Sequence, residues 1–302
     1  MYELVSVVIT TYKRTKDEIS KSIYSVLNQT YKNIELIIVD DSPRDYVYRD
    51  EIKEFCESIK DNRVRYIQHE VNKGACVARN TGMNNCSGSY ISFLDDDDEY
   101  LPNRIENMVK LIEEDEEIVL VYCNANIVDA ISKEIKGSFF DGNQQYKGKV
   151  YDEIMCSNFV GSTSMGLIRI EALKKIGGFD PLMEASQDWD VWIRLSQIGC
   201  VTYTTEKLIN YYKHSGERIS NNTQKRIKGI RRLNYKCKDY LFTHKEAWIA
   251  RKRFEMRLLS MDRNLIETLK CYIEIVKKCP RDIIENIKLI KVFGHFFIKY
   301  ND

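Results

Sequence analysis

The sequence lacks the features that mark several common classes of protein. Its nine cysteines are an odd number and form no C-x-x-C pair, which argues against a disulfide framework and a structural zinc site. No stretch approaches the roughly 18–20 consecutive apolar residues of a membrane-spanning helix. The apolar run Leu4–Ile9 is too short for a signal peptide. These absences predict a cytoplasmic protein in a reducing compartment.

Two nucleotide-binding motifs are also missing. The chain contains no G-x-G-x-x-G, and residues 142–149 match a phosphate-binding loop only in part. One residue too many separates the two glycines there, and Val150 stands where serine or threonine should follow the lysine. A nicotinamide-dependent dehydrogenase and a P-loop phosphotransferase are therefore disfavoured. Any bound phosphate has to be neutralised by another group, such as a metal ion.

The composition is that of a globular protein with an uneven charge distribution. With 302 residues, of which 43% are hydrophobic, the chain is long enough for one large or two modest domains. The formal net charge is +1, but residues 221–302 carry 20 Lys and Arg against 9 Asp and Glu. Residues 1–220 carry 26 against 36. The sequence thus predicts an acidic main domain followed by a basic C-terminal region.

Short β-branched runs alternate with segments of helical apolar spacing over the first hundred residues. Strands are predicted at Val5–Ile9, Glu35–Val39, Arg63–Gln68 and Tyr90–Leu94, with helices at 19–27, 50–59 and 74–85. A helix at 103–118, a strand at 119–126 and a helix at 188–198 follow. Strands that alternate with helices predict a mostly parallel sheet covered on both faces. Ligands of such sheets bind outside the carboxyl ends of the strands.

An acidic run, Asp95–Asp98 followed by Glu99, comes directly after the last of these strands. Consecutive carboxylates repel one another and need either a cation or dispersal into solvent. Oxygen ligands of this kind suit Mg²⁺ or Mn²⁺, which share their coordination shell with substrate phosphates. An acidic surface loop is the alternative for the run taken alone, but its place at a strand end favours a metal site.

Other polar residues also follow predicted strands. Asp40 and Asp41 could accept a hydrogen bond from the N3–H of uracil, or they could cap a following helix. Tyr12 could stack on a base or pack in the core. Arg14 and Arg79 could meet a diphosphate or lie solvated at the surface. Taken singly, each residue leaves both interpretations open.

Several segments, in order along the chain, resemble the family 2 glycosyltransferases of the GT-A fold. They are Ser6–Tyr12, Ile23–Tyr31, Glu35–Asp41, Asn72–Gly74, Ala78–Asn80, Gly88–Asp98 and Tyr100–Pro102. The resemblance implies a Rossmann-like α/β fold of the nucleotide-diphospho-sugar transferase type, with a mostly parallel sheet flanked by helices. It implies a catalytic domain at 1–218, made of a nucleotide-binding half at 1–102 and an acceptor-side half at 103–218. A basic helical region at 219–302 follows.

The resemblance also implies roles for residues of the acidic run. The family's Asp-x-Asp motif falls on Asp95–Asp97, with Asp97 coordinating Mn²⁺ or Mg²⁺ and Asp95 or Asp96 holding the ribose or a metal-bound water. The register within the four aspartates is open by one position. The other residues expected to bind the nucleotide sugar are Thr10, Thr11, Tyr12, Arg14, Asp40, Asp41 and Arg79.

Two downstream segments, Ile176–Asp180 and Gln187–Leu195, resemble the acceptor side of the same family. The family has a Glu-Asp pair that supplies the general base, and here Gln replaces the Glu while Asp188 is kept. Residues 211–214 are similar to a Tyr-Arg-x-His segment with lysine in place of arginine. The resemblance implies that His214 joins the metal or the diphosphate, and a capping or packing histidine is the alternative.

The resemblance implies a metal-dependent, inverting transfer of one sugar from a nucleotide-sugar donor, most simply a UDP-sugar. The acceptor would be a carbohydrate or a lipid-linked glycan of surface polysaccharide synthesis. The Gln-x-x-Arg-Trp motif and the multiple spans of processive synthases are absent from the sequence. A non-catalytic nucleotide-sugar or carbohydrate-binding protein on the same fold is the alternative function. No nucleic-acid partner is expected, because the basic region contains no recognised motif.

The C-terminal residues 283–300 predict a basic amphipathic helix. Apolar residues keep helical spacing, and Lys288, Lys291 and Lys299 gather on another side. Such a helix could lie on the anionic inner face of the plasma membrane, where lipid-linked acceptors reside. It could equally pack on the catalytic domain or in a homodimer.

Overall fold

The computed structural model describes residues 3–142, 144–213 and 222–280. The chain divides into two compact units. The first comprises residues 1–154, 158–182 and 188–215, and the second comprises 155–157, 183–187 and 216–302. The domain boundary predicted after residue 218 and the amphipathic helix predicted at 283–300 both lie outside the described residues.

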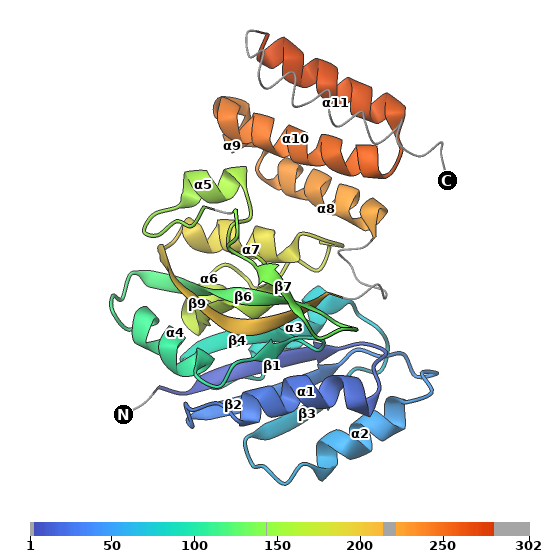
Figure 1. Cartoon of the computed structure of the whole chain (residues 1–302), viewed down its shortest axis with the longest axis vertical. Coiled ribbons are helices and arrows are strands. Elements are labelled where there is room, and N and C mark those ends of the chain that lie inside the picture. Colours follow the sequence, from blue (N-terminus) through green and yellow to red (C-terminus); the bar gives the residue numbers. More distant parts are fainter. Residues whose placement is uncertain (1–2, 143, 214–221, 281–302) are drawn as a thin grey trace. The chain divides into compact units, whose positions relative to one another are not determined.

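The first half of unit 1 is a parallel sheet (Figure 1). Its strands are β1 (Val5–Thr11), β2 (Ile34–Asp40), β3 (Val64–Gln68) and β4 (Tyr90–Asp95). They lie in the order β3-β2-β1-β4, and every neighbouring pair is parallel. All four strands were predicted, β3 from the alternation of residues 63–68 and the others from their apolar runs. Their carboxyl ends therefore meet at one edge of the sheet, as expected for an α/β fold with a ligand site there.

The second half of the sheet is mixed. Its strands are β5 (Glu99–Tyr100), β6 (Ile118–Asp129), β7 (Ile135–Ser138), β8 (Gly166–Arg169) and β9 (Cys200–Lys213). The short β8 is inserted between β4 and β6 and is antiparallel to both. β9 runs parallel to β6, while β5 is antiparallel to β9. This arrangement joins the end of the acidic run, at Glu99, to the last strand of the unit.

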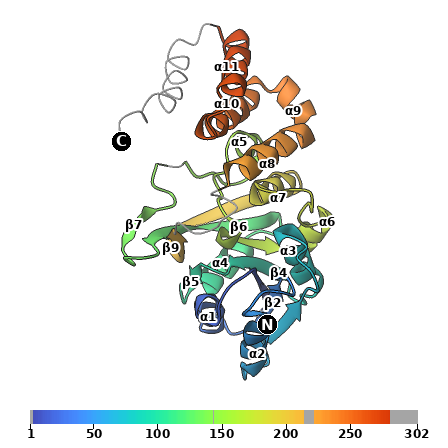
Figure 2. The ribbon, with the colours of Figure 1, turned by 90° about the vertical axis from the view of Figure 1, so that its right-hand side faces the viewer.

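Helices cover both faces of the sheet because successive residues of its strands point to opposite sides. The helices of this part of the chain are α1 (Lys16–Leu27), α2 (Arg49–Ser58), α3 (Ala75–Asn84), α4 (Arg104–Ile112), α5 (Tyr151–Cys156), α6 (Ile170–Lys175) and α7 (Gln187–Ser196), with a short 3₁₀ helix, η1 (Thr163–Met165). The end of α5 and the first residue of α7 belong to the second unit. Val7 packs in a core cluster with residues of α1, α2 and α4. Gly82 of α3 lies against Val8 on the other face, where a Cβ would come within 2.3 Å of the valine side chain. Figure 2 shows α1 and α3 on opposite sides of these strands.

The helix predicted at 103–118 ends sooner than its apolar spacing suggests. α4 ends at Ile112, and an acidic stretch, 113–117, leads into β6. The side chain of Asp115 accepts a hydrogen bond from the amide of Glu117 (2.8 Å), and its carbonyl accepts one from the amide of Ile118 (3.1 Å). Aspartate competes with the helix in this way because its short side chain can bond to the nearby backbone.

The described part of unit 2 is largely helical. Its helices are α8 (Thr223–Lys236), α9 (Lys238–Thr243), α10 (Lys245–Met261) and α11 (Leu265–Lys278). Arg231 of α8 pairs with Glu255 of α10 (2.7 Å), and Lys252 pairs with Glu274 of α11 (2.9 Å). Buried Arg251 donates to the carbonyl of Met155 (2.6 Å), which ties the segment 155–157 into this unit. Within the described ranges, none of the helices combines the length and apolarity needed to cross a bilayer.

Candidate active site

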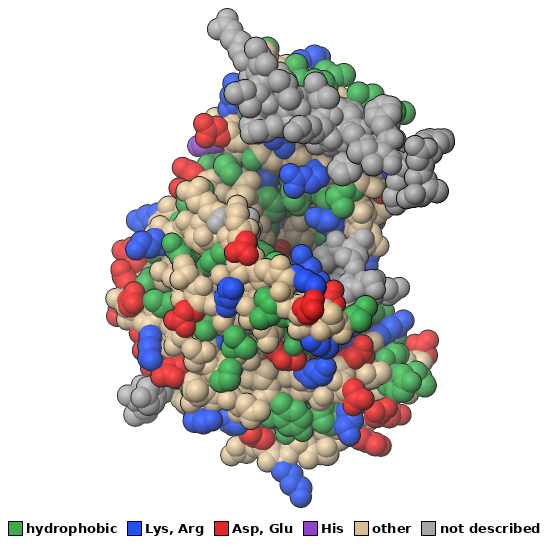
Figure 3. All heavy atoms as spheres, in the orientation of Figure 1, with side chains coloured by type: hydrophobic (Ala, Val, Ile, Leu, Met, Phe, Trp, Pro, Cys, Tyr) green, Lys and Arg blue, Asp and Glu red, His purple; other side chains and the backbone are tan. Residues whose placement is uncertain are grey.

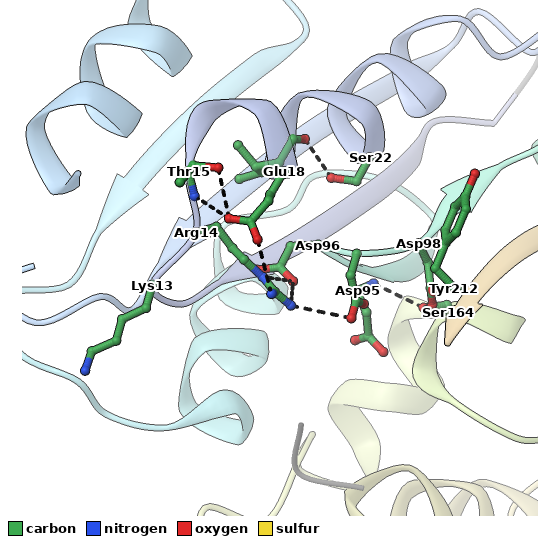
Figure 4. Close-up of polar contacts among 12 residues, drawn as sticks. Lys13, Arg14, Thr15, Glu18, Ser22, Asp95, Asp96, Asp98, Ser164 and Tyr212 are labelled. Carbon is green, nitrogen blue, oxygen red and sulfur yellow. Dashed lines mark hydrogen bonds and ion pairs between the residues drawn. The ribbon is translucent and has the colours of Figure 1, made fainter. Parts of the chain in front are cut away.

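The four aspartates after β4 lie in different surroundings. Asp95 is the last residue of β4, and the amide of Asp98 donates to its carbonyl (3.0 Å), which closes a tight turn before β5. The amide of Asp95 donates to the hydroxyl of Ser164 in η1 (3.1 Å). Figure 4 shows Asp96 beside Arg14, whereas Asp98 lies with Ser164 and Tyr212. On the face seen in Figure 3, acidic and basic side chains are interspersed over the first unit.

Asp98 is a structural residue of this turn. Its side chain is fully buried, and one carboxyl oxygen accepts a hydrogen bond from the hydroxyl of Ser164 (3.0 Å). The other accepts the backbone amide of Tyr212 in β9 (3.2 Å). A carboxylate that is buried and bonded on both oxygens holds two segments together. It is therefore the least suited of the four to coordinate a metal ion, which narrows the register that the sequence left open.

Asp96 and Asp97 both pair with Arg14. The Nε of Arg14 lies 3.0 Å from a carboxyl oxygen of Asp96, and its Nη2 lies 3.4 Å from one of Asp97. Burial raises the pKa of Asp96 to about 6, although the guanidinium of Arg14 opposes the shift. Arg14, predicted to meet a diphosphate, thus serves here as a counter-ion of the acidic run.

Asp95 pairs with a different arginine, Arg79. Arg79 of α3 donates to a carboxyl oxygen of Asp95 (2.9 Å), and the same oxygen lies 3.3 Å from the hydroxyl of Thr163 in η1. The guanidinium carbon of Arg79 lies 5.5 Å from the centre of the Phe179 ring. Arg79 is largely buried, so the interpretation as a solvated surface arginine is wrong.

Metal binding at Asp95 and Asp97 stays a prediction, and it requires an ion that is shared with a nucleotide. Within the described ranges, no three side chains of His, Cys, Asp or Glu gather closely enough to hold a metal by themselves. Mg²⁺ and Mn²⁺ sites of nucleotide enzymes need only one or two carboxylates, since substrate phosphates and water complete the shell. His214, the other predicted ligand, lies outside the described residues.

Asp188, the predicted general base, lies in the first turn of α7. One carboxyl oxygen accepts the amide of Trp189 (2.7 Å), and the other accepts the side-chain amide of Asn158 (3.3 Å). Burial raises the pKa of Asp188 to about 6, although the Trp189 amide and the charge of Arg79 oppose the shift. The charge of Asp95 acts in the same direction as burial. The fold therefore brings Asp188 into the electrostatic field of Asp95 and Arg79.

Gln187, which replaces the glutamate of the family's pair, makes a local contact. Its side-chain amide donates to the carbonyl of Met183 (3.0 Å). A glutamate could not make this bond when ionised, because a carboxylate only accepts. The substitution therefore has a structural reason in this chain.

Asp40 is buried at the carboxyl end of β2. One oxygen accepts the amide of Ser42 (2.8 Å), and the other accepts the hydroxyl of Tyr66 (2.7 Å) and the side-chain amide of Gln68 (3.3 Å). Because the Asp40 side chain is fully buried, contact with a uracil would require a neighbouring group to move. Asp40 does not cap α2, which begins at Arg49.

Asp41 is also buried and supports the turn before α3. Its carboxylate accepts the amides of Lys73 (2.8 Å) and Gly74 (2.7 Å) and contacts Nδ1 of His69 (2.7 Å). Gly74 has a φ of +89°, a conformation that favours glycine. Both aspartates are buried in this conformation, so the prediction that they read the base depends on a rearrangement.

The residues at the end of β1 lie beside the acidic run. Thr10 is in register with Asp95 of the neighbouring strand, and Thr11 is buried. Tyr12 is 42% exposed, so the core-packing interpretation of this ring is wrong. The chain turns at Lys13, which has a φ of +52° and donates its amide to the hydroxyl of Ser42 (2.9 Å). The exposed ring of Tyr12 has a face on which a base could stack.

Sequence reasoning missed three residues of this site: Asn158, Thr163 and Ser164. They come from the connection between α5 and β8 and contact Asp188, Asp95 and Asp98. Small polar residues are common in loops of any protein. The single sequence therefore held no signal that separates them from an ordinary connection.

The mixed α/β sheet flanked by helices defines a class, that of the proteins with a GT-A-like glycosyltransferase fold. The family model described as Glycosyl transferase family 2 matches residues 6–177. This match covers more than half of the chain, and the chain therefore belongs to glycosyl transferase family 2. The family predicted from the sequence is confirmed, and so is its α/β fold.

Individual relatives agree with this assignment. A glycosyltransferase of Methanocaldococcus jannaschii is 34% identical over 63% of this chain and 64% of its own length. The Escherichia coli enzyme WfaP, named UDP-Glc:alpha-D-GlcNAc-diphosphoundecaprenol beta-1,3-glucosyltransferase, is 31% identical over 75% of this chain and 84% of its own. The crystal structure of S. aureus TarS 1-349 with UDP-GlcNAc has a TM-score of 0.60 at 16% identity, covering 97% of this chain and 80% of that 1-349 chain. The chain spans less than two thirds of the M. jannaschii protein and of two Rickettsia relatives.

Proposed function

We propose that this protein is a metal-dependent, inverting glycosyltransferase that moves one sugar residue from a UDP-sugar to a carbohydrate or lipid-linked acceptor. The observation that carries the proposal is the half-buried side chain of Asp188, whose carboxyl pKa is raised to about 6 by desolvation, with the charges of Arg79 and Asp95 nearby. A base with a raised pKa is suited to take a proton near neutral pH. The relatives support the same activity, because they are named glycosyltransferases.

The proposed reaction is a single displacement. The acceptor hydroxyl oxygen bonds to the anomeric carbon as the bond from that carbon to the diphosphate oxygen breaks. Asp188 takes the proton of the hydroxyl, and the nucleoside diphosphate leaves with the bonding electrons. A divalent ion held by Asp97, with Asp95 beside it, would stabilise the negative charge of the leaving group. Arg14 and Arg79 hold positive charge at the same strand end.

The relatives and the fold neighbour support a uridine donor and a lipid-linked acceptor. The name of WfaP specifies UDP-Glc as donor and a diphosphoundecaprenol-linked sugar as acceptor. TarS was crystallised in complex with UDP-GlcNAc. Surface polysaccharide synthesis is part of the proposal, and Tyr12 is proposed to stack on the uracil.

The donor class can be tested by thermal stabilisation with MnCl₂ and a panel of UDP, CDP, GDP and dTDP. UDP is expected to raise the melting temperature most, because the proposed donor is a UDP-sugar. A ligand at a hundredfold excess over its Kd stabilises the folded protein by about 2.7 kcal/mol. Repeating the panel with EDTA should remove the shift if the diphosphate binds through a metal. A clear preference for GDP would overturn the uridine assignment. Stabilisation without any transfer or hydrolysis of the matching sugar nucleotides would favour a binding protein.

Peripheral membrane contact through 283–300 is part of the same proposal, because a lipid-linked acceptor lies in the membrane. The excess of basic residues from 221 onward supports contact with anionic lipid. Co-sedimentation with vesicles of phosphatidylglycerol and phosphatidylcholine is expected for the full chain and reduced for a chain that ends near Asp282. Equal sedimentation of the two would remove this segment as the membrane contact. The protein would then act on the cytoplasmic face by other means.

A further inference from the structure

A short turn, Asn158–Gly161, lies beside the proposed base and contributes no charged group to the site. The amide of Gly161 donates to the side-chain oxygen of Asn158 (3.0 Å). The side-chain nitrogen of Asn158 donates to the carbonyl of Gly161 (3.3 Å) and to a carboxyl oxygen of Asp188 (3.3 Å). Three hydrogen bonds thus meet on one half-buried asparagine.

The turn fixes which way the asparagine amide faces. An amide nitrogen such as that of Gly161 only donates, so the group facing it has to be the side-chain oxygen of Asn158. The other end of the planar amide, the NH₂ group, is then directed at Asp188. The asparagine therefore presents a donor to the carboxylate in a fixed orientation.

Helix α7 contacts this turn at two points. Asp188 accepts from Asn158, and the indole nitrogen of Trp192 donates to the carbonyl of Gly161 (3.0 Å). Residues four apart lie on the same face of a helix, so Asp188 and Trp192 both contact this turn. Trp192 is fully buried, and Gly166 leaves room for its ring, where a Cβ would lie 2.8 Å from a ring carbon. The position of the turn relative to the base is therefore set by rigid packing.

The turn also depends on glycine at its last position. Gly161 has a φ of +94°, and a Cβ there would lie 2.6 Å from the ring of Phe139. Both the backbone conformation and the close approach of the ring require the absence of a side chain. The backbone carbonyl that Trp192 contacts is placed by this glycine.

We propose that Asn158 is a positioning residue for Asp188, which holds the carboxylate in one orientation and stabilises its ionised form. This role rests on the proposed function, because holding the carboxylate assists transfer only if Asp188 is the general base. With one oxygen bonded to Trp189 and the other to Asn158, the carboxyl plane is held at both oxygens. The remaining lone pairs then face a defined direction, in which an acceptor hydroxyl is to be held.

The pKa of Asp188 in the free protein tests this role directly, without substrate. Protein labelled with ¹³C at the aspartate carboxyl carbons is titrated by NMR, and Asp188→Asn identifies the resonance. Loss of a hydrogen bond to the ionised form in Asn158→Ala is expected to raise this pKa by about 0.5–1 unit. Asn158→Asp keeps an oxygen for the Gly161 amide but adds a negative charge, and its shift should be larger still.

Asn80 offers a matched control. Its side chain makes the same pair of backbone bonds, to the carbonyl (2.7 Å) and from the amide (2.8 Å) of Phe179. Asn80→Ala should lower stability to a similar degree and shift the pKa of Asp188 less than Asn158→Ala does, because it can act on Asp188 only through Arg79 beside Phe179. If Asn158→Ala and Asn158→Asp both titrate like the wild type, the positioning role is overturned. If the pKa moves as expected but Asp188→Asn still transfers sugar, the positioning contact stands and the proposed base is wrong.

Discussion

Asp188→Asn is expected to lower the rate of glycosyl transfer by about 10²–10⁴-fold, the usual contribution of a positioned general base. The amide of asparagine has nearly the shape of the carboxylate, and its oxygen can still accept a hydrogen bond from the Trp189 amide, but it cannot take the acceptor proton. Its NH₂ then faces the NH₂ of Asn158, so the hydrogen bond from Asn158 is lost as well. Binding of the nucleotide should remain close to that of the wild type, because the roles proposed for the donor site fall on other residues. Transfer rates with the donor selected by the nucleotide panel, and calorimetry with UDP and Mn²⁺, measure the two quantities separately.

The pH dependence provides the control for this prediction. Since Asp188 acts as a base only when ionised and burial raises its pKa to about 6, the rate should rise with pH through about 6 and level off above it. The residual rate of Asp188→Asn should lack this rise. Asp96 has a pKa raised to about the same value, so the pH dependence of nucleotide binding has to be measured as well. A wild-type rate in the variant would rule out Asp188 as the base.

Asp97→Ala is expected to abolish metal-dependent nucleotide binding. Its carboxylate lies in the turn after Asp95, and its contact with Arg14 (3.4 Å) is longer than the contact of Asp96 with the same guanidinium (3.0 Å). Removal of a metal-ligating carboxylate takes away both the charge and the oxygen that the ion requires. Calorimetry with UDP should show strong binding in Mn²⁺ for the wild type, and equally weak binding with or without Mn²⁺ for the variant.

Asp98→Asn is the matched control, since it removes a negative charge from the neighbouring position. The asparagine oxygen can accept the Tyr212 amide, and its NH₂ can donate to the hydroxyl of Ser164. We expect a loss of stability of about 1–3 kcal/mol, seen in denaturant unfolding, with Mn²⁺-dependent UDP binding retained. If metal-dependent binding survives in Asp97→Ala but is lost in folded Asp98→Asn, Asp98 and not Asp97 is the metal ligand.

The parallel half of the sheet could be predicted because its signals are local. β1 and β2 are short β-branched runs and β4 is a short, largely apolar run, each followed by polar residues, and the spacing of α1 was readable from Ile19 onward. The mixed half could not be predicted in the same way. β8 has four residues, and its place between β4 and β6 depends on partners far along the chain. Strand pairing of this kind is decided by packing that no local pattern records.

The residues of the site also fall into those that the sequence predicted and those that it did not. The acidic run, Asp188 and the arginines stood out because charge is conspicuous beside a predicted strand or within a family motif. Asn158 carries no charge and lies outside the segments that resemble the family, so only its contact with Asp188 identifies it. The engagement of Asp40 with Tyr66 and Gln68 was likewise unreadable, since those partners belong to another strand.

The sequence by itself determined the family, the alternation of strands and helices, and the presence of acidic residues where parallel strands end. These follow from residue order, because hydrophobic periodicity and motifs are local properties of the chain. Only the tertiary structure decided how four consecutive aspartates differ. Asp96 and Asp97 pair with Arg14, Asp95 pairs with Arg79, and Asp98 is buried between η1 and β9. The physical reason is that a turn points adjacent side chains in different directions, and the segments packed there set the burial and partners of each.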